Sequence, residues 1–496
     1  MPIYEKLRIT PLLAAEEQDE KRRIAANLLR LRKDLRAHFQ KPDARLAGVQ
    51  VQPERDSTRL LRLATWNIRE FDSQKYGQRL EESLFYIAEI MAQFDLVAVQ
   101  EVRENREALD AVMGLLGPGW RYIATDVTEG RPGNRERMVF VYNAHKVFFS
   151  SIAGEVILPD DNVDDVLHFK KGAWLELPDD AEAIVLRKDT DTDRRGGQGL
   201  KINEEYVFRL PEKTRLVLPE GSQLILPRRT PVEETDSGAP AFPLDRQLED
   251  VLLRLPYKAV SSDSLSFARS PYLVTFQAGW LKLTLCTVHI YYGKGALGMR
   301  RRKAEIYRLT DFLAERAQSE HDSDADSFFI ALGDFNIVDR EHETMKALER
   351  HGFRVPEKLQ SLPGTNVKKD KYYDQIAYCH NPDDPDSLTG GVTRVEVQRA
   401  GVYDFFETVF RIGETAEPGT ADIDIYQKRS RELAEAIAEA QADKRKKAEP
   451  TPEEEQAIVE DKYQDWRTYQ MSDHLPMWVE LRIDFGDEFL QEVAGG

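Results

Sequence analysis

From residue 60 onward, the apolar positions of the chain switch repeatedly between the spacing of strands and the spacing of helices. The runs 60–68 and 95–102 are short and almost continuously apolar, which predicts buried strands. Between and after them, 79–94 and 106–117 repeat apolar residues every three to four positions, which predicts helices. Residues 138–151 predict two more strands. This β-α-β-α order indicates an α/β domain.

The same pattern returns in the second half of the chain. Residues 272–292 predict two adjacent strands and 301–318 a helix. The run SFFIALGDFNI, residues 327–337, predicts a buried strand that ends in polar groups, and 476–485 predicts a closing strand. We therefore expect one catalytic domain over residues 58–485.

Two segments break this pattern. The first, 158–256, has short apolar pieces separated by Pro and Gly, with a hairpin predicted at 216–226, so we expect a mainly β insertion. The second, 414–462, contains a charged, Ala-rich helical stretch and predicts an exposed helical insertion, or one that caps a partner. We expect the insertions to shape substrate access or a partner interface, and no motif within them says which.

An N-terminal helical extension precedes the domain at 1–57. A helix is predicted from residue 14 to about residue 40, with an apolar face formed by Ile24, Leu28, Leu31, Leu35 and Phe39. The same helix is locally basic, through Lys21, Arg22, Arg23, Arg30, Arg32, Lys33 and Arg36. It is interpreted either as an amphipathic helix that packs on the domain or as an arm that touches nucleic acid or a partner.

Composition narrows the class of protein. The chain has 496 residues, 41% of them hydrophobic, which suffices for a large core. Its net charge of −18 disfavours diffuse attraction to nucleic acid, and an acidic protein that acts on phosphates needs a metal ion or a positive cleft. The two cysteines, Cys286 and Cys379, indicate neither a disulfide framework nor a Cys-rich zinc site. We see no signal peptide and no membrane-length apolar run, which leads us to expect a soluble cytoplasmic protein.

Polar side chains stand at the ends of several predicted strands. Asp334 and Asn336 are two residues apart, so in an extended chain they point to one face, and a carboxylate beside an amide suits a hard metal ion and its bound phosphate. Other runs end in or carry Asn67, Glu101, His289, Asp374, Asp473 and His474. Each alone could be a satisfied core or turn residue. Together they indicate an active site, because open α/β sheets place active groups at strand ends.

Seven motifs in this order resemble the endonuclease/exonuclease/phosphatase superfamily of metal-dependent phosphoesterases. They are TWNIR at 65–69, QEVRE at 100–104, RERMVFVYN at 135–143, VHIYY at 288–292, GDFN at 333–336, YYDQIAY at 372–378 and SDHLP at 472–476. The resemblance is greatest to the pancreatic-type deoxyribonuclease branch. It implies a four-layer α/β sandwich, with two mixed β-sheets packed face to face and helices outside.

Two positions depart from that branch. Its usual Asp-Arg-Ile is Asp-Gln-Ile here, with Gln375 in place of the arginine. Where the nuclease has a DNA-contacting tyrosine, this chain has Asn134. Both departures weaken the expectation that double-stranded DNA is the substrate.

The resemblance also implies a metal site. Glu101 is the main expected ligand, a hard oxygen donor for Mg²⁺, with Mn²⁺ or Ca²⁺ as alternatives. Asn67 and Asp334 are expected to complete or adjoin the site, and the resemblance adds Asp473.

The acid–base groups implied by the resemblance are two histidines, each backed by a carboxylate. His474 is paired with Asp374 and His289 with Glu136, and we assign water activation to His474 and assistance to the leaving oxygen to His289. The phosphate groups of the substrate are assigned to Asn336, Arg103 and Arg137.

These assignments predict a Mg²⁺-dependent endonuclease acting on DNA. One alternative is a phosphatase or phosphodiesterase on a smaller phosphoester, such as a lipid head group or a nucleotide. The other is a catalytically inactive scaffold whose insertions bind a partner.

Overall fold

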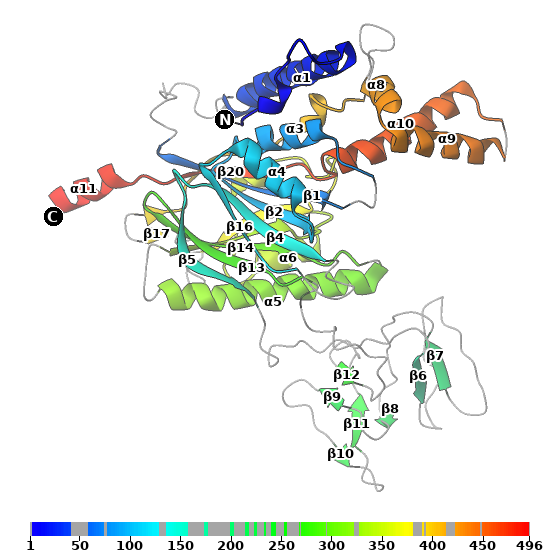
Figure 1. Ribbon diagram of the computed structural model, residues 1–496. Helices are drawn as coiled ribbons and strands as arrows, with labels where there is room; N and C mark the ends of the chain where they lie inside the picture. The colour runs from blue at the N-terminus through cyan, green and yellow to red at the C-terminus, as the bar shows by residue number, and fades with distance from the viewer. Residues whose placement is uncertain are drawn as a thin grey trace. The chain divides into compact units, whose positions relative to one another are not determined.

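The structure is a computed structural model in which the chain divides into two compact units (Figure 1). The first unit comprises Met1–Val156, Arg269–Ile290 and Leu309–Gly496, and the second comprises Ile157–Ala268 and Tyr291–Arg308. The structure describes residues 2–40, 58–73, 77–127, 135–156, 173–176, 199–202, 214–217, 223–225, 233–234, 240–244, 252–254, 267, 269–293, 295–321, 327–379, 389–390, 393–412, 422–446 and 449–495.

A six-stranded mixed sheet forms one half of the first unit. Its strand order is β19-β20-β1-β2-β4-β3, in which β1 and β2 are parallel and every other neighbouring pair is antiparallel. The strands are β1 (Leu60–Phe71), β2 (Leu96–Arg103), β3 (Trp120–Ala124), β4 (Glu136–Asn143), β19 (Val397–Val402) and β20 (Met477–Arg482).

A five-stranded mixed sheet forms the other half. Its order is β16-β15-β14-β13-β5, with β14 and β15 parallel and the other pairs antiparallel. The strands are β5 (Phe148–Glu155), β13 (Tyr272–Ala278), β14 (Leu281–His289), β15 (Ser327–Asp334) and β16 (Asp374–Cys379). The two adjacent strands predicted at 272–292 are β13 and β14, which pair with each other antiparallel.

The two sheets pack face to face, with β1 against β15 and β16, and β2 against β14 and β15. Helices α3 (Glu81–Met91) and α4 (Glu107–Leu116) cover the outer face of the six-stranded sheet (Figure 1). On the other side lies α5 (Gly295–His321), whose residues from Leu309 onward belong to the first unit. The Thr310 hydroxyl of α5 donates to Ala347 O of α6 (Glu343–Leu348). The expected four-layer α/β sandwich is confirmed.

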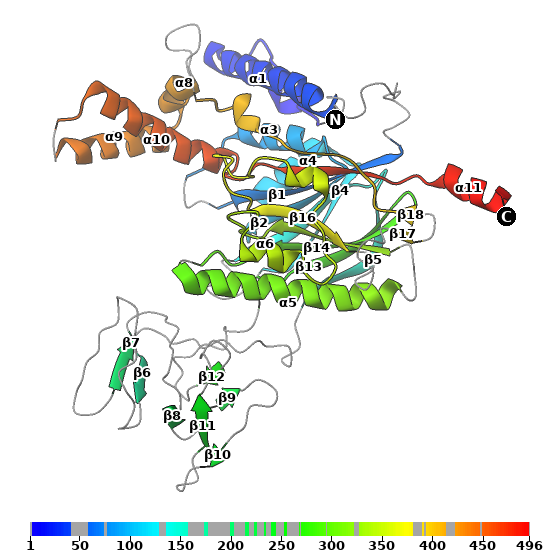
Figure 2. The ribbon, with the colours of Figure 1, turned by 180° about the vertical axis from the view of Figure 1, so that it is seen from behind.

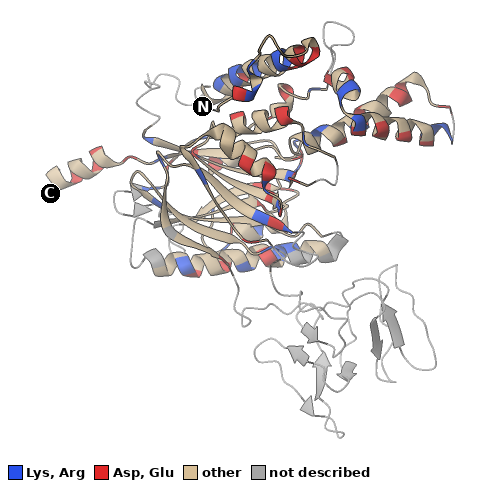
Figure 3. Cartoon of the chain, viewed as in Figure 1, with Lys and Arg blue, Asp and Glu red and all other residues tan. Residues whose placement is uncertain are grey.

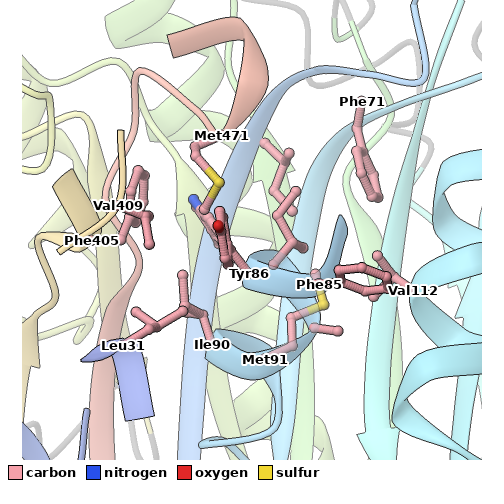
Figure 4. Packing of buried hydrophobic residues seen from close by; sticks show 14 of the residues in the cluster. Leu31, Phe71, Phe85, Tyr86, Ile90, Met91, Val112, Phe405, Val409 and Met471 are labelled. Carbon is pink, nitrogen blue, oxygen red and sulfur yellow. The ribbon is translucent and has the colours of Figure 1, made fainter. Parts of the chain in front are cut away.

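The N-terminal helix α1 (Ala15–Gln40) packs on this sandwich through the apolar face that the sequence predicts. Its buried hydrophobic residues are Ile24, Leu28, Leu31, Leu35 and Phe39. Figure 4 shows Leu31 beside Ile90 of α3, with Phe405 and Val409 from a later part of the chain next to them.

Several of the basic side chains of α1 are held by the domain itself. Arg23 pairs with Glu82 at 2.8 Å, Arg32 pairs with Glu89 at 2.8 Å, and Arg30 donates to Thr408 O at 2.9 Å. These contacts favour the interpretation of α1 as a packing helix, since three of the expected basic groups point inward. Lys33 and Arg36 are exposed.

The second unit contains short strands, and much of the predicted 158–256 insertion lies outside the described residues. The strands are β6 (Ala173–Glu176), β7 (Gly199–Ile202), β8 (Thr214–Val217), β9 (Gln223–Ile225), β10 (Glu233–Glu234), β11 (Pro240–Leu244) and β12 (Leu252–Arg254). The predicted hairpin at 216–226 is wrong, because β8 pairs with β11 and β9 pairs with β12.

Helices follow in the region of the second insertion. They are α8 (Asp422–Arg429), α9 (Arg431–Arg445) and α10 (Pro452–Gln470), with α11 (Gly486–Gly495) after the last strand. Helices α9 and α10 each carry more acidic than basic residues, as the colours along them show (Figure 3). Thr451 and Glu454 form a capping box at the start of α10. Figure 2 shows α9 and α10 lying side by side from the opposite direction.

The remaining short elements are η1 (Glu5–Leu7), α7 (Glu357–Gln360), β17 (Thr389–Gly390), β18 (Thr393–Arg394) and η6 (Phe405–Glu407). Among the helices that the structure describes, none is long and apolar enough to cross a lipid bilayer.

Candidate active site

Four polar strand ends from both sheets meet at one edge of the sandwich. Asn67 is the last residue of the regular β1–β2 pairing before a register shift, and Glu101 lies near the end of β2. His289 and Asp334 are register partners at the ends of β14 and β15. The Asn67 amide donates to Glu101 Oε1 at 3.1 Å and to Asp334 Oδ2 at 3.0 Å. One side chain therefore joins the ends of the two sheets.

The backbone at this edge is strained. Three non-glycine residues adopt positive φ here, namely Glu70 (49°), Glu101 (62°) and Asn336 (54°). Such conformations persist only where the surroundings fix them, and they concentrate at functional sites. Glu101 is held in part by the Glu70 N–H, which donates to Glu101 Oε2 at 2.7 Å.

The first histidine, His289, is backed by Glu136 across the sandwich. His289 Nδ1 lies 2.9 Å from Glu136 Oε2, which is the pairing expected from sequence. Its Nε2 edge faces two other carboxylates, Glu101 Oε1 at 3.8 Å and Asp334 Oδ2 at 3.6 Å. A carboxylate behind one nitrogen orients the ring and leaves the other nitrogen for proton transfer.

Glu136 is itself fixed by two arginines. Arg269 donates to it through Nε at 2.6 Å, and Arg103 Nη1 lies 3.7 Å away. Burial raises the pKa of Glu136, but the imidazole of His289 and the guanidinium groups outweigh burial and hold that pKa below its usual range. The carboxylate therefore stays ionised beside the histidine.

The second histidine, His474, is backed by Asp374. His474 Nδ1 lies 2.7 Å from Asp374 Oδ2, again the expected pairing, and His474 Nε2 lies 3.9 Å from Asp334 Oδ2. Burial lowers the pKa of His474, but Asp374, Asp334 and Asp473 together raise it well above its usual value. Thr365 positions Asp374, since the Thr365 hydroxyl accepts a hydrogen bond from the Asp374 N–H at 3.1 Å.

Asp334 and Asn336 are held together, as their spacing suggested. The Asn336 N–H donates to Asp334 Oδ1 at 2.8 Å, and the Asn336 side-chain amide donates to Ile290 O at 2.7 Å. Both side chains are buried. The amide of Asn336 is thus anchored at the end of β14, beside His289.

The expected metal ligands surround Glu101. Burial raises the pKa of Glu101, and the nearby Glu136 and Asp473 carboxylates raise it further while His289 opposes them. Within the described part of the chain, no three His, Cys, Asp or Glu side chains form a ready-made metal cage. Beside Glu101, the side-chain oxygen of Asn67 is buried without a hydrogen-bond partner, and so is Asp374 Oδ1 behind His474.

The two predicted phosphate-binding arginines differ in position. Arg103 lies in the site, where it pairs with Glu70 and Glu136. Arg137 Nη1 instead donates to Thr125 O at 2.8 Å and lies 3.4 Å from Asp126. Because Arg137 follows Glu136 directly on β4, its side chain points to the opposite face of that strand.

Three residues that sequence analysis missed support the site. Arg269 binds Glu136, Glu70 binds both Arg103 and Glu101, and Ser472 joins two strand ends. The Ser472 hydroxyl donates to Asn67 O at 2.6 Å and accepts from the His474 N–H at 3.0 Å. Ser472 directly precedes the Asp-His pair, and that adjacency is a signal that could have identified it.

The sequence of this chain matches a known protein family and a curated protein. The sequence profile of the Endonuclease/Exonuclease/phosphatase family matches residues 64–366. Deoxyribonuclease-1 of Rattus norvegicus is 33% identical over 92 residues, which are 18% of this chain and 31% of that protein. The chain thus spans about a third of the length of this curated relative.

Solved structures of the family were also matched. An endonuclease/exonuclease/phosphatase family protein from Bacteroides thetaiotaomicron has a TM-score of 0.39 at 13% identity, covering 86% of this chain and 98% of that one. A mannosyl-6-phosphatase from the same organism has a TM-score of 0.38 at 13% identity, covering 85% and 99%. On the profile match, which spans more than half of its length, the chain belongs to the Endonuclease/Exonuclease/phosphatase family of hydrolytic phosphoesterases.

Proposed function

We propose that the protein is a divalent-metal-dependent endonuclease that hydrolyses phosphodiester bonds in DNA. The observation that carries this proposal is the pair of carboxylate-backed histidines. Both direct Nε2 toward the same carboxylate oxygen of Asp334, at 3.6 Å from His289 and 3.9 Å from His474. Two proton-transfer groups around one point suit a displacement that needs a proton removed from water and a proton delivered to a leaving oxygen.

The residues at the edge of the site fit a magnesium ion. Mg²⁺ is usually held by one or two carboxylates, with water and substrate phosphate completing its shell, so it needs no cage of three protein ligands. Glu101 supplies a partly buried carboxylate, and the unpartnered side-chain oxygen of Asn67 supplies a neutral donor next to it. Asp334 and Asp473 would adjoin the ion. When bound, the metal would polarise the phosphoryl oxygens.

The chain's own residues would carry the protons. In this proposal His474 removes a proton from water, with Asp374 fixing its tautomer, and His289 gives a proton to the leaving oxygen, with Glu136 fixing the ring. Asn336 would donate to the phosphoryl group without adding negative charge. Arg103 would add positive charge beside the scissile phosphate, and Arg137 would contact a flanking phosphate only after leaving Thr125 O.

DNA as the substrate is supported by the partial match to a deoxyribonuclease. A smaller phosphoester remains the second candidate, and Gln375 favours it. The Gln375 amide donates to Tyr372 O at 2.8 Å and is buried, so this position supplies no cationic contact for a polynucleotide. The net charge of −18 also favours the smaller phosphoester, because it repels a polynucleotide.

The test is a comparison of substrates with the full-length protein. Supercoiled plasmid and a chromogenic phosphodiester are each incubated with Mg²⁺ and with EDTA. We expect Mg²⁺-dependent nicking of the plasmid. Turnover of the small ester alone would transfer the proposal to the second candidate, and no turnover of either substrate would refute both.

A further inference from the structure

A polar cluster lies in the interior between the two sheets, one step back from the active-site edge. Thr65 of β1, Gln100 of β2 and Thr287 of β14 are each 0% exposed. Gln100 Nε2 donates to Thr287 Oγ1 at 2.8 Å, which crosses from the six-stranded sheet to the five-stranded one. The Thr65 hydroxyl donates to Gln100 Oε1 at 3.3 Å and accepts from Gln100 Nε2 at 3.2 Å.

An irregularity in β2 explains how Gln100 reaches the opposite sheet. The pairing of β2 with β4 runs from Val99↔Val139 to Val102↔Arg137, so Gln100 and Glu101 together oppose a single residue of β4. This is a β-bulge, and the positive φ of Glu101 lies within it. Neighbouring residues of a regular strand point to opposite faces, whereas the bulge turns both Gln100 and Glu101 inward.

Each member of the cluster is close in sequence to an active-site residue. Thr65 is two positions before Asn67, and Thr287 is two positions before His289, so each pair shares one face of its strand. Gln100 directly precedes Glu101. The bond from Gln100 to Thr287 therefore ties the strand of the expected metal ligand to the strand of the histidine.

Apolar packing alone does not fix this alignment. Hydrophobic contacts are non-directional, so two apolar sheet faces tolerate small sliding movements. A satisfied hydrogen-bond cluster in an apolar interior accepts one arrangement and penalises others, because any slide leaves a buried donor unpaired. In some proteins, buried polar groups fix the alignment of packed elements while they add little stability.

We propose that Gln100 is a positioning residue, which through Thr287 sets the cross-sheet placement of His289 relative to Glu101. This proposal rests on the proposed phosphodiesterase function of the same site. The distance that Gln100 is proposed to set is the 3.8 Å between His289 Nε2 and Glu101 Oε1. Gln100 touches neither substrate nor metal in this role.

Thr287→Val is the first test, because valine keeps the shape of threonine and removes the acceptor of Gln100. Its matched control is Thr284→Val. Thr284 lies on the same strand, is also 0% exposed, and bonds to Thr275 Oγ1 at 3.2 Å, away from the site. We expect both variants to lower Tm by a similar few degrees. Thr287→Val should lower kcat by about 10- to 100-fold, with KM changed less than about twofold.

Thr287→Ser supplies the rescue, since serine restores the hydroxyl while losing the methyl group. It should recover most of kcat although its Tm stays low. A merely structural role of the cluster would make kcat independent of the hydroxyl, with Thr287→Val and Thr284→Val equally active. That result would overturn the proposal.

The triple variant T65V/Q100L/T287V separates stability from positioning. It replaces the whole cluster by apolar groups, so no donor is left unpaired, and Tm should equal or exceed that of the wild type. We still expect kcat to fall about 10- to 100-fold. A stable triple variant with full kcat would refute the positioning role. If it does not fold, the Thr287 and Thr284 variants still decide.

Crystal structures give a readout that does not depend on activity. In Thr287→Val the separation of His289 Nε2 and Glu101 Oε1 should differ from that in Thr287→Ser and in the wild type. An unchanged separation would refute the positioning role even in an active enzyme. A wild-type protein that cleaves no phosphodiester would refute the proposed function and leave this structural comparison intact.

Discussion

Glu136 holds His289 from the opposite sheet, with its Oε2 2.9 Å from Nδ1 of the imidazole. The carboxylate comes from β4 in the six-stranded sheet and the histidine from β14 in the five-stranded one. The orientation of the ring thus depends on the packing of the two sheets, and activity should respond to changes that leave each sheet intact.

His289 is expected to assist the leaving oxygen, and a sulfur-substituted substrate can show this. His289→Ala should lower the cleavage rate of ordinary DNA by about 100- to 10,000-fold, because the leaving oxygen then departs without a proton. With a bridging sulfur at the leaving position, the loss should largely disappear, since a thiolate needs no protonation. Equal losses on both substrates would assign His289 another role.

His474 is expected to activate water, and its loss should not be rescued by that sulfur substrate. His474→Ala and Asp374→Asn should each lower kcat by about 100- to 10,000-fold while circular dichroism remains unchanged. His145→Ala, which removes an exposed imidazole, is the control and should be fully active. Near-normal turnover of His474→Ala would contradict the mechanism.

We expect Glu101 to be the main ligand of the metal ion on which activity depends. EDTA should abolish activity, and Glu101→Gln should weaken Mn²⁺ binding, measured by calorimetry, by more than the roughly 10- to 100-fold typical of indirect partners. Asp126→Asn removes an exposed carboxylate near Arg137 and is the matched control for charge. Unchanged Mn²⁺ affinity in Glu101→Gln would place the metal elsewhere.

Glu480 predicts a pH dependence of stability far from the catalytic groups. It is buried between Arg62, at 2.9 Å, and Arg399, at 2.8 Å. Burial raises the pKa of Glu480, but the hydrogen bonds from Arg399 and Arg62 outweigh burial and lower it. A lowered folded-state pKa stabilises the protein above the unfolded value of about 4.3, and this contribution disappears as the pH falls through the folded value.

The test is urea unfolding of the wild type and of Glu480→Gln at a series of pH values. We expect Glu480→Gln to be less stable by about 3 kcal/mol near neutral pH, and the difference should shrink below about pH 4. A difference that grows as the pH falls would have the wrong sign for this ion pair.

The N-terminal helix should matter for stability and not for DNA binding. Leu31→Ala should destabilise the protein by about 2–5 kcal/mol, because Leu31 is completely buried. Lys33→Ala combined with Arg36→Ala changes two exposed basic groups in the second half of α1 and should leave stability, KM for plasmid and its salt dependence unchanged. A weaker salt dependence in the double variant would instead support the nucleic-acid arm.

Much of this fold follows from local sequence patterns. The predicted face of α1 is the face that is buried, and strand runs with polar ends converge because parallel pairs bring those ends to one edge. The pairing of β8 with β11 could not be predicted in this way. Proximity in sequence favours a hairpin, whereas strand pairing depends on contacts with distant segments.

The site residues also divide into those that local sequence reveals and those that it does not. His289 stands out because a histidine in an apolar run is conspicuous, and His474 stands out because it follows Asp473 directly before a predicted strand. Arg269 and Gln100 do not, since their roles depend on a partner in another strand and on a bulge that no local pattern reveals. The motif groups Arg137 with Glu136, but adjacent residues on a regular strand face opposite ways, so the motif does not show that Arg137 points away from Glu136.

The position of α1 has a consequence for how the chain folds during synthesis. The last turn of this helix is synthesised well before one of its partners in β20, since His38 accepts a hydrogen bond from Trp478 at 3.1 Å and Phe39 contacts the same indole. That partner is translated more than 400 positions later. Closing so long a loop is entropically slow, so we expect the surface of His38 and Phe39 that meets Trp478 to stay uncovered, and open to chaperones, until β20 is made, whereas Leu31 can pack on α3 earlier.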